Sequence, residues 1–187
     1  DQPEPPGDFF VDEKNHQADL TEVGRKIGAI NTIIRQRDGS LLGDNTDGKG
    51  FIRAVAETGL DLKGTSAVLF GAGGAARAVG VELGMAGAKS VTIVNRTASK
   101  AADLAAHIAR ETGARTTGAA WIGDFPVPAD TQLVVNCTSI ALAPNVTDLV
   151  AAEYSTLRAG MLVCDVIPNP PDTPFLTGQR VFDSIFP

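Results

Sequence analysis

Residues 66–87 read SAVLFGAGGAARAVGVELGMAG, a short apolar run followed by a glycine-rich turn and a stretch that reads as a helix. The apolar run has the length of one buried strand. A glycine-rich turn between a strand and a helix is the setting in which the backbone N–H groups of a helix N-terminus bind phosphate. These residues therefore predict a strand, a phosphate-binding loop and a helix, in that order.

The same alternation of strands and helices continues along the chain. Apolar strands are expected at 90–94, within 129–139 and within 159–166, and an Ala-rich helix is expected at 97–113. Strands separated by helical stretches of this length form a parallel, doubly wound sheet. The predicted class is α/β, with a Rossmann-type sheet.

The first part of the chain has a different pattern. Residues 1–26 are polar and contain several prolines, so they are expected to be irregular. Two strands should follow, in the stretches GAINTIIRQ and LLGDN, joined by a turn at Asp38-Gly39. A short amphipathic helix should begin after Gly48 and stop at Gly59.

The glycine-rich loop provides the first candidate binding residues. Gly71 permits the tight turn, and Gly73, which has no side chain, lets a diphosphate approach the backbone N–H groups. The alternative is a glycine-rich turn that only packs a helix. The strand before the loop and the helix after it favour dinucleotide binding. The predicted contacts in this loop are Gly71, Ala72, Gly73, Gly74 and Ala75.

The end of the second strand indicates which dinucleotide. Sites that prefer NAD place Asp or Glu there, to bind the ribose hydroxyls. This chain instead has Asn95, Arg96 and Thr97, with Lys100 one turn further on. The Arg96 guanidinium can bind a 2′-phosphate, and Thr97 can donate a hydrogen bond to it while also capping the next helix. NADP is therefore the predicted cofactor; the alternative is that Arg96 is only a solvated surface residue.

Composition excludes several classes of function. The formal net charge of −6 and the lack of a basic stripe argue against nucleic-acid binding. Cys137 and Cys164 both fall in apolar runs and are expected to be buried core thiols. His16 and His107 have no spacing typical of a zinc site with these cysteines, so no metal is predicted. No membrane-spanning run or signal peptide is recognised, so a cytoplasmic location is expected.

A set of motifs then points to a family. Gly43 to Gly48 reads GDNTDG, about a dozen residues after Ala29-Ile30-Asn31-Thr32. The GAGGA loop, the NRT triplet at 95–97, NCTS at 136–139 and Asp165 followed by TPFL at 173–176 come next. In this order the motifs resemble the shikimate dehydrogenase family over roughly residues 27 to 176. The resemblance implies a Rossmann NADP-binding domain at 48–187, preceded by the remnant of an N-terminal α/β substrate domain at 1–47.

The resemblance also implies an activity, the reversible reduction of 3-dehydroshikimate to shikimate with NADPH. Asn31 would bind the substrate, and Asp47 would bind it and act with a lysine at the reacting hydroxyl. Hydride transfer to a ketone does leave an alkoxide that must be protonated, so an acid–base group is needed. Asp47 could instead only cap a turn, as Asp44 is expected to do. Thr138 and Ser139 are expected to line the nicotinamide pocket.

Some expected features of the family are missing. The NVTxPxK segment that carries its lysine is not found; Lys14 is the nearest candidate, and Lys26 is a worse one. The closing DGLGM segment is also missing, and Gln179 has no motif support. Pro168 stands where many members have an aromatic residue, which leaves shikimate, quinate and related ring acids open.

Two explanations suit these gaps: a fragment or joined segments of a longer protein, or a degenerate relative that lost catalysis. The competing functions are a quinate/shikimate dehydrogenase-like paralogue, a catalytically silent NADPH-binding module and, more weakly, a glutamyl-tRNA reductase-like enzyme. A small-molecule substrate is expected, with no nucleic-acid or membrane partner. The protein is expected to be a monomer or a homodimer.

Overall fold

We describe residues 19–177 of a computed structural model of this chain, which divides into two compact units. The first unit ends at Asp47 and the second begins at Gly48. Each unit is described separately below. No helix within residues 19–177 is long and apolar enough to cross a membrane.

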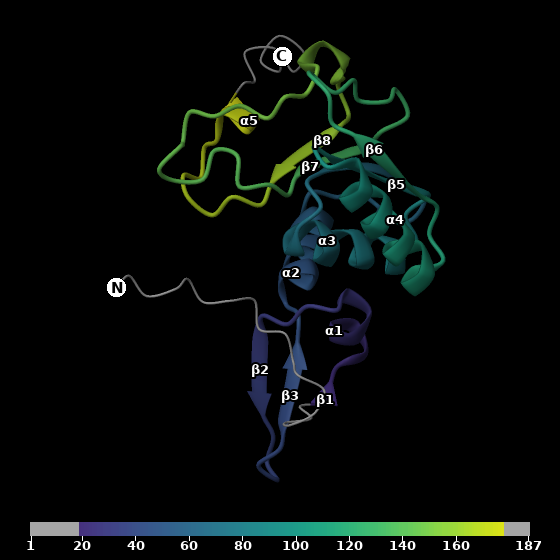
Figure 1. Ribbon diagram of the computed structural model, residues 1–187, viewed down its shortest axis with the longest axis vertical. Coiled ribbons are helices and arrows are strands. Elements are labelled where there is room, and N and C mark those ends of the chain that lie inside the picture. The colour runs from purple at the N-terminus through teal and green to yellow at the C-terminus, as the bar shows by residue number, and fades with distance from the viewer. Residues whose placement is uncertain (1–18, 178–187) are drawn as a thin grey trace. The chain divides into compact units, whose positions relative to one another are not determined.

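The first unit contains a three-stranded sheet in the order β1-β3-β2 and one short helix (Figure 1). β2 and β3 pair antiparallel, and the predicted turn between them is confirmed, with Gly39 in a left-handed conformation at φ 91°. β1 pairs with β3 in the parallel direction. The bounds are β1 Asp19–Leu20, α1 Glu22–Ile27, β2 Thr32–Arg35 and β3 Leu41–Asp44.

The prediction that residues up to 26 are irregular is wrong for the described part of that stretch. Helix α1 begins after Thr21, whose hydroxyl oxygen accepts a hydrogen bond from the Gly24 N–H at 3.0 Å. It ends at Gly28, which adopts a left-handed conformation at φ 69°. A helix of six residues is too short to show a helical repeat of apolar positions, so only its two caps identify it in the sequence.

The second unit contains a five-stranded sheet in the order β6-β5-β4-β7-β8, and every pair of neighbours is parallel. The predicted doubly wound Rossmann-type sheet is therefore confirmed. The first helix, α2, begins at the boundary between the two units. The bounds are α2 Asp47–Glu57, β4 Ser66–Phe70, α3 Gly74–Met85, β5 Ser90–Asn95, α4 Ala98–Thr112, β6 Thr116–Ala120, β7 Leu133–Asn136, a 3-10 turn Tyr154–Thr156, β8 Leu162–Asp165 and α5 Pro174–Thr177.

Strand β6 is the element of this sheet that the sequence analysis missed. Its sequence, TTGAA, is not a buried apolar run, because β6 lies at the edge of the sheet and is largely exposed. Gly118 in its middle lets the strand approach helix α4 closely. A Cβ at Gly118 would lie 2.6 Å from the backbone of Ala101 and Ala102.

Helices α3 and α4 pack against each other and cover one face of this sheet (Figure 1). Gly80 of α3 makes their contact possible, because a Cβ there would lie 2.5 Å from Ile108 Cδ1 of α4. Leu69 of β4 points into the same layer and is fully buried. The close contact of helices and sheet fixes where the N-terminus of α3 lies at the end of β4.

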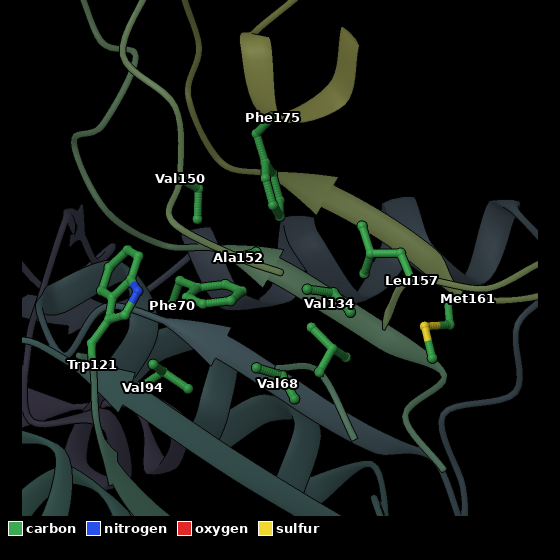
Figure 2. Close-up of a cluster of buried hydrophobic side chains, with 11 residues drawn as sticks. Val68, Phe70, Val94, Trp121, Val134, Val150, Ala152, Leu157, Met161 and Phe175 are labelled. Carbon is green, nitrogen blue, oxygen red and sulfur yellow. The ribbon is translucent and has the colours of Figure 1, made fainter. Parts of the chain in front are cut away.

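The other face of the sheet is covered by a cluster of apolar side chains from the loops and from α5 (Figure 2). Phe70 lies at its centre, with its ring centroid 5.0 Å from that of Trp121 and 6.2 Å from that of Phe175. The Trp121 indole N–H donates to the Ala151 carbonyl at 2.8 Å, so its buried polar group is satisfied. Burying a side chain of this size contributes about 1.5–3 kcal/mol, so this cluster holds the long loops on the sheet.

Candidate functional site

The glycine-rich loop joins β4 to α3, as predicted, and Gly71 is its first residue. Gly71 has φ 108°, which disfavours any residue with a side chain, and its N–H donates to the Val94 carbonyl at 2.7 Å. A Cβ at this position would also lie 2.9 Å from the Cys137 carbonyl oxygen. Gly71 is therefore required both for the turn and for the close approach of the loop that follows β7.

The mouth of α3 is open. A Cβ at Gly73 or Gly74 would meet no heavy atom within 4 Å, and both glycines are exposed. The first N–H groups of a helix have no partner within the helix, and the helix dipole adds positive potential there. Ala72 and Ala75 flank these glycines and are half-buried. Among the described residues, the space beside Gly73 and Gly74 is therefore open, which leaves room for a phosphate group to approach the N-terminus of α3.

The sheet order places this loop at the point where the chain changes direction. β4 pairs with β5 on one side and with β7 on the other, and the connections after β4 and β7 lead to opposite sides of the sheet. In open α/β sheets, ligands bind outside the carboxyl ends of the strands at such a point. The loop at Gly71 therefore lies where this fold places its ligand.

The residues that follow β5 form the second part of the candidate site. The Asn95 amide donates to the Thr97 carbonyl at 3.1 Å, which orders the turn into α4. Arg96, Thr97 and Lys100 are all exposed. Positively charged groups and hydrogen-bond donors are therefore accessible at this end of the sheet.

The prediction that the Thr97 side chain caps α4 is wrong. Thr97 occupies the N-cap position, but its side chain makes no capping hydrogen bond. The Asn95 amide, not the Thr97 hydroxyl, orders this turn. The Thr97 hydroxyl is therefore not used by its own helix.

The loop after β7 contains the residues predicted to line a nicotinamide pocket. The Thr138 hydroxyl donates its proton to Asn136 Oδ1 at 2.6 Å and accepts from the Ile140 N–H at 3.0 Å. Because a hydroxyl has one proton, Thr138 cannot donate to a ligand while it keeps this bond. Ser139 is exposed and makes no such internal bond among those of the described chain. Of the two predicted residues, Ser139 offers the accessible hydroxyl.

The candidate substrate residues lie in the first unit and at the start of α2. Asn31 is exposed, and its Oδ1 accepts from the Thr46 N–H at 3.0 Å and from the Thr32 hydroxyl at 2.9 Å. The Asn45 side chain accepts from the Asp47 N–H at 3.1 Å, which fixes the start of α2. Asp47 is the first residue of that helix and is exposed.

Asp44 differs from Asp47 in its surroundings. It is only 7% exposed, and its carboxylate accepts a hydrogen bond from the Thr21 hydroxyl. This bond ties β3 to the start of α1. Asp44 therefore holds the small unit together, whereas the carboxylate of Asp47 is accessible.

Lys14, His16 and Gln179 lie outside the described residues. Lys26 is half-buried and forms an ion pair with the exposed Glu22 at 3.7 Å. Within residues 19–177, no three His, Cys, Asp or Glu side chains gather as they would around a metal ion.

The two cysteines are only partly as predicted. Cys137 is buried but follows β7 instead of lying in it, and Cys164 lies in β8 but is half-buried, because β8 is an edge strand. Burial, with the nearby charge of Asp165, raises the pKa of Cys164 to about 11 and that of Cys137 further. Burial therefore favours the protonated form of both thiols, which disfavours their use as nucleophiles.

Sequence reasoning named Asn136 and Asp165 only as parts of motifs and gave them no role. The structure joins them, because Asn136 Nδ2 donates to Asp165 Oδ1 at 3.1 Å. Asn136 is fully buried at the end of an otherwise apolar strand, and Asp165 ends the neighbouring strand opposite it. A polar residue at the end of each of two apolar strands was the available signal.

Comparison with known proteins agrees with this architecture. A sequence model described as Shikimate / quinate 5-dehydrogenase matches residues 54–119. The shikimate dehydrogenase (NADP(+)) of Desulforamulus reducens is 41% identical over 172 residues, which are 89% of this chain and 56% of that protein. This chain thus spans about half the length of the curated relatives that it matches.

Two solved structures are also similar. The ligand-free 5-ketofructose reductase of Gluconobacter sp. strain CHM43 is 46% identical, with a TM-score of 0.81, over 87% of this chain and 58% of that one. The quinate dehydrogenase of Corynebacterium glutamicum, in complex with NAD, is 30% identical, with a TM-score of 0.77, over 87% and 57%. The relatives thus share a fold but differ in the substrate that their names give.

Proposed function

We propose that this chain belongs to the shikimate/quinate 5-dehydrogenase family and takes part in the NADP-dependent interconversion of 3-dehydroshikimate and shikimate. The observation that carries the proposal is the open mouth of α3, where glycines leave the helix N-terminus accessible. It lies beside a strand end that offers Arg96 and Lys100 and no carboxylate at residues 95–97. This combination favours a dinucleotide with a 2′-phosphate.

In this proposal the second unit holds the cofactor. The loop from Gly71 to Ala75 binds the diphosphate through backbone N–H groups, and Arg96 and Thr97 bind the 2′-phosphate, with Asn95 ordering their turn and Lys100 adding charge. NADPH, when bound, supplies the hydride for reduction of the substrate ketone. Ser139 contributes a hydroxyl next to the nicotinamide, and Thr138 packs the loop.

The residues proposed for the substrate are Asn31 and Asp47. Reduction of a ketone creates an alkoxide, which needs a proton from a positioned group. Asp47 is accessible at the start of α2, where its N–H is already fixed by Asn45, so its carboxylate is free to bind a substrate hydroxyl. A lysine paired with Asp47 carries the proton; Lys14 is the nearest candidate in the sequence.

A second candidate function is the reduction of 5-ketofructose. The Gluconobacter reductase is 46% identical to this chain, against 41% for the Desulforamulus shikimate dehydrogenase. Pro168 also replaces the aromatic residue that many shikimate dehydrogenases have in the loop after β8. An open-chain or cyclic ketose has no carboxylate, so the two candidates differ in the charge that the substrate site must accept.

A substrate panel separates these functions. Shikimate and quinate are supplied with NADP+ or NAD+, and 5-ketofructose with NADPH or NADH, while absorbance of the reduced nicotinamide is followed. Turnover of shikimate with NADP+ supports the lead proposal. Turnover of 5-ketofructose alone supports the second candidate, and cofactor binding without turnover of any substrate identifies a silent module.

The cofactor preference gives a sharper test. We expect Arg96→Ala to weaken NADP+ binding by about 10–100-fold, because a charge-assisted hydrogen bond contributes about 1.5–3 kcal/mol. NAD+, which has no 2′-phosphate, should bind within about twofold of its wild-type affinity. Isothermal titration calorimetry measures both affinities.

A matched control is Arg115→Ala. Arg115 is exposed and precedes β6, so it lies at the amino end of the same sheet, opposite the candidate site. This substitution should leave both affinities unchanged. Equal losses of NADP+ and NAD+ affinity in Arg96→Ala would show that Arg96 does not bind the 2′-phosphate.

A further inference from the structure

One carboxylate joins the two loops that leave the carboxyl ends of β7 and β8. Asp165 ends β8 and lies opposite Asn136, the last residue of β7. Its Oδ1 accepts from Asn136 Nδ2 at 3.1 Å and from the Ile167 N–H at 3.0 Å. Its Oδ2 accepts from the Thr173 hydroxyl at 2.7 Å. Both Asn136 and Thr173 are fully buried, so these bonds are shielded from water.

The first of these loops, residues 137–141, is held in one conformation by Asn136. The Asn136 side-chain oxygen accepts from both the N–H of Thr138, at 3.0 Å, and its hydroxyl, at 2.6 Å. Ala141, at the end of the loop, is fully buried and has φ 73°, a left-handed conformation that side chains rarely adopt. Such a conformation persists only where the surrounding structure enforces it, and it is typical of functional sites.

The second loop, residues 166–173, is held at both of its ends by the same carboxylate. Asp165 binds the Ile167 N–H near the start of the loop and the Thr173 hydroxyl at its end. Thr173 also begins α5, since its carbonyl accepts from the Thr177 N–H at 2.8 Å. Phe175 then anchors α5 in the apolar cluster that covers one face of the sheet (Figure 2).

The order of the strands in the sheet indicates which half of a bound dinucleotide would contact these two loops. β5, whose end offers Arg96, lies on one side of β4, and β7 and β8 lie on the other. With the diphosphate at α3 and the 2′-phosphate after β5, the nicotinamide half extends over β7 and β8. The loop after β7 also touches the phosphate loop, because the Cys137 carbonyl lies 2.9 Å from the position of a Cβ at Gly71.

We infer that Asp165 is a positioning residue for the nicotinamide half of the cofactor, a role that rests on the proposed NADP-dependent function. Asp165 does not touch the ligand. It locks the loops after β7 and β8 in the conformation that receives the nicotinamide, through Asn136 on one side and Thr173 on the other. The adenosine half is bound by other loops and does not depend on it.

The test removes one hydrogen bond from Asp165 without changing the size of the side chain. Thr173→Val deletes the hydroxyl, and Thr173→Ser restores it. Asp172→Asn is the matched control, because Asp172 is the exposed neighbour of Thr173. Calorimetry compares two ligands: NADP+, and adenosine 2′,5′-bisphosphate, which has the 2′-phosphate but no nicotinamide.

We expect Thr173→Val to weaken NADP+ binding by about tenfold, which equals about 1.4 kcal/mol, and to leave adenosine 2′,5′-bisphosphate within about twofold. Thr173→Ser should return NADP+ affinity to within about threefold of wild type, and Asp172→Asn should change neither ligand. Asp165→Asn is the second variant if Thr173→Val does not fold, and the same split is expected, because an amide nitrogen cannot accept a hydrogen bond.

Equal losses for both ligands, or unchanged affinity for both, would overturn the inference, since a general effect on folding would not distinguish the two halves of the cofactor. If the wild-type protein binds neither ligand, the proposed function itself fails, and the role of Asp165 with it. If the wild type binds both ligands but the variants show no split, only the role of Asp165 fails.

Discussion

Gly71→Ala is expected to destabilise the protein by about 3 kcal/mol or more and to abolish dinucleotide binding. Two independent costs act at this position. A side chain at φ 108° is strained, which costs about 1–3 kcal/mol. The new Cβ would also lie 2.9 Å from the Cys137 carbonyl, a backbone atom that cannot rotate away, so the loop after β7 must move. Urea unfolding and calorimetry with NADP+ measure the two effects.

Gly73→Ala is the matched control for this prediction, because it places the same methyl group two residues away. A Cβ at Gly73 meets no atom within 4 Å, and its φ of −92° suits any residue. The free energy of unfolding should fall by no more than about 1 kcal/mol, from loss of an N-cap glycine. NADP+ should nevertheless bind at least about tenfold more weakly, since the methyl group occupies the approach to the N–H groups of α3.

The two substitutions test separate claims, so the prediction for one can be wrong while the prediction for the other holds. A Gly71→Ala protein as stable as wild type would show that the close contact with Cys137 relaxes without cost. A Gly73→Ala protein that binds NADP+ normally would show that the diphosphate does not approach the mouth of α3, and the cofactor assignment would lose its main support.

The sequence predicted those parts of the fold that depend on local patterns. SAVLF, the glycine turn and the helix after it are contiguous, so strand periodicity and turn chemistry were sufficient to predict β4 and α3. Strand β6 was missed, because an exposed edge strand with a central Gly118 lacks the apolar run that marks a buried strand. Its place in the sheet is determined by its contact with α4, which is not visible in the local sequence.

The same distinction applies to the candidate site. The residues proposed to bind the cofactor, in the loop after β4 and the turn after β5, follow their strands directly, so the sequence alone was sufficient to propose them. The bond between Asn136 and Asp165 joins residues 29 positions apart and forms only when β7 pairs with β8, and the bond between Thr173 and Asp165 depends on the path of the loop after β8. The hydrogen bond that the Thr138 hydroxyl donates to Asn136 likewise cannot be predicted from the sequence, because it depends on the conformation of both side chains.

The largest effect on catalysis is expected at Asp47. We expect Asp47→Asn to lower kcat by about 10²–10⁴-fold, because Asp47 is proposed to position the lysine that carries the proton, and a positioned acid–base group usually contributes this much. NADP+ affinity should stay within about twofold, because the cofactor contacts are assigned to the loops after β4 and β5. The structural cost should be small: Asn keeps the size of the side chain, and loss of a negative charge in the first turn of α2 costs about 0.3–1 kcal/mol.

Asp38→Asn is the matched control for this substitution, because Asp38 is an equally exposed carboxylate in the turn between β2 and β3. The Asp38 carboxylate accepts hydrogen bonds from Ser40, and these bonds lower its pKa. Asp38 is therefore a turn residue with no proposed role in the reaction. Steady-state kinetics with whichever substrate the panel identifies, with calorimetry for NADP+, should show a loss of kcat in Asp47→Asn alone. If the two variants keep equal activity, Asp47 only begins helix α2 and does not assist the lysine that is proposed to carry the proton. Asp47 would then be only a turn residue. The protein would keep the loop proposed to bind the cofactor but would lack the proposed partner of the catalytic lysine.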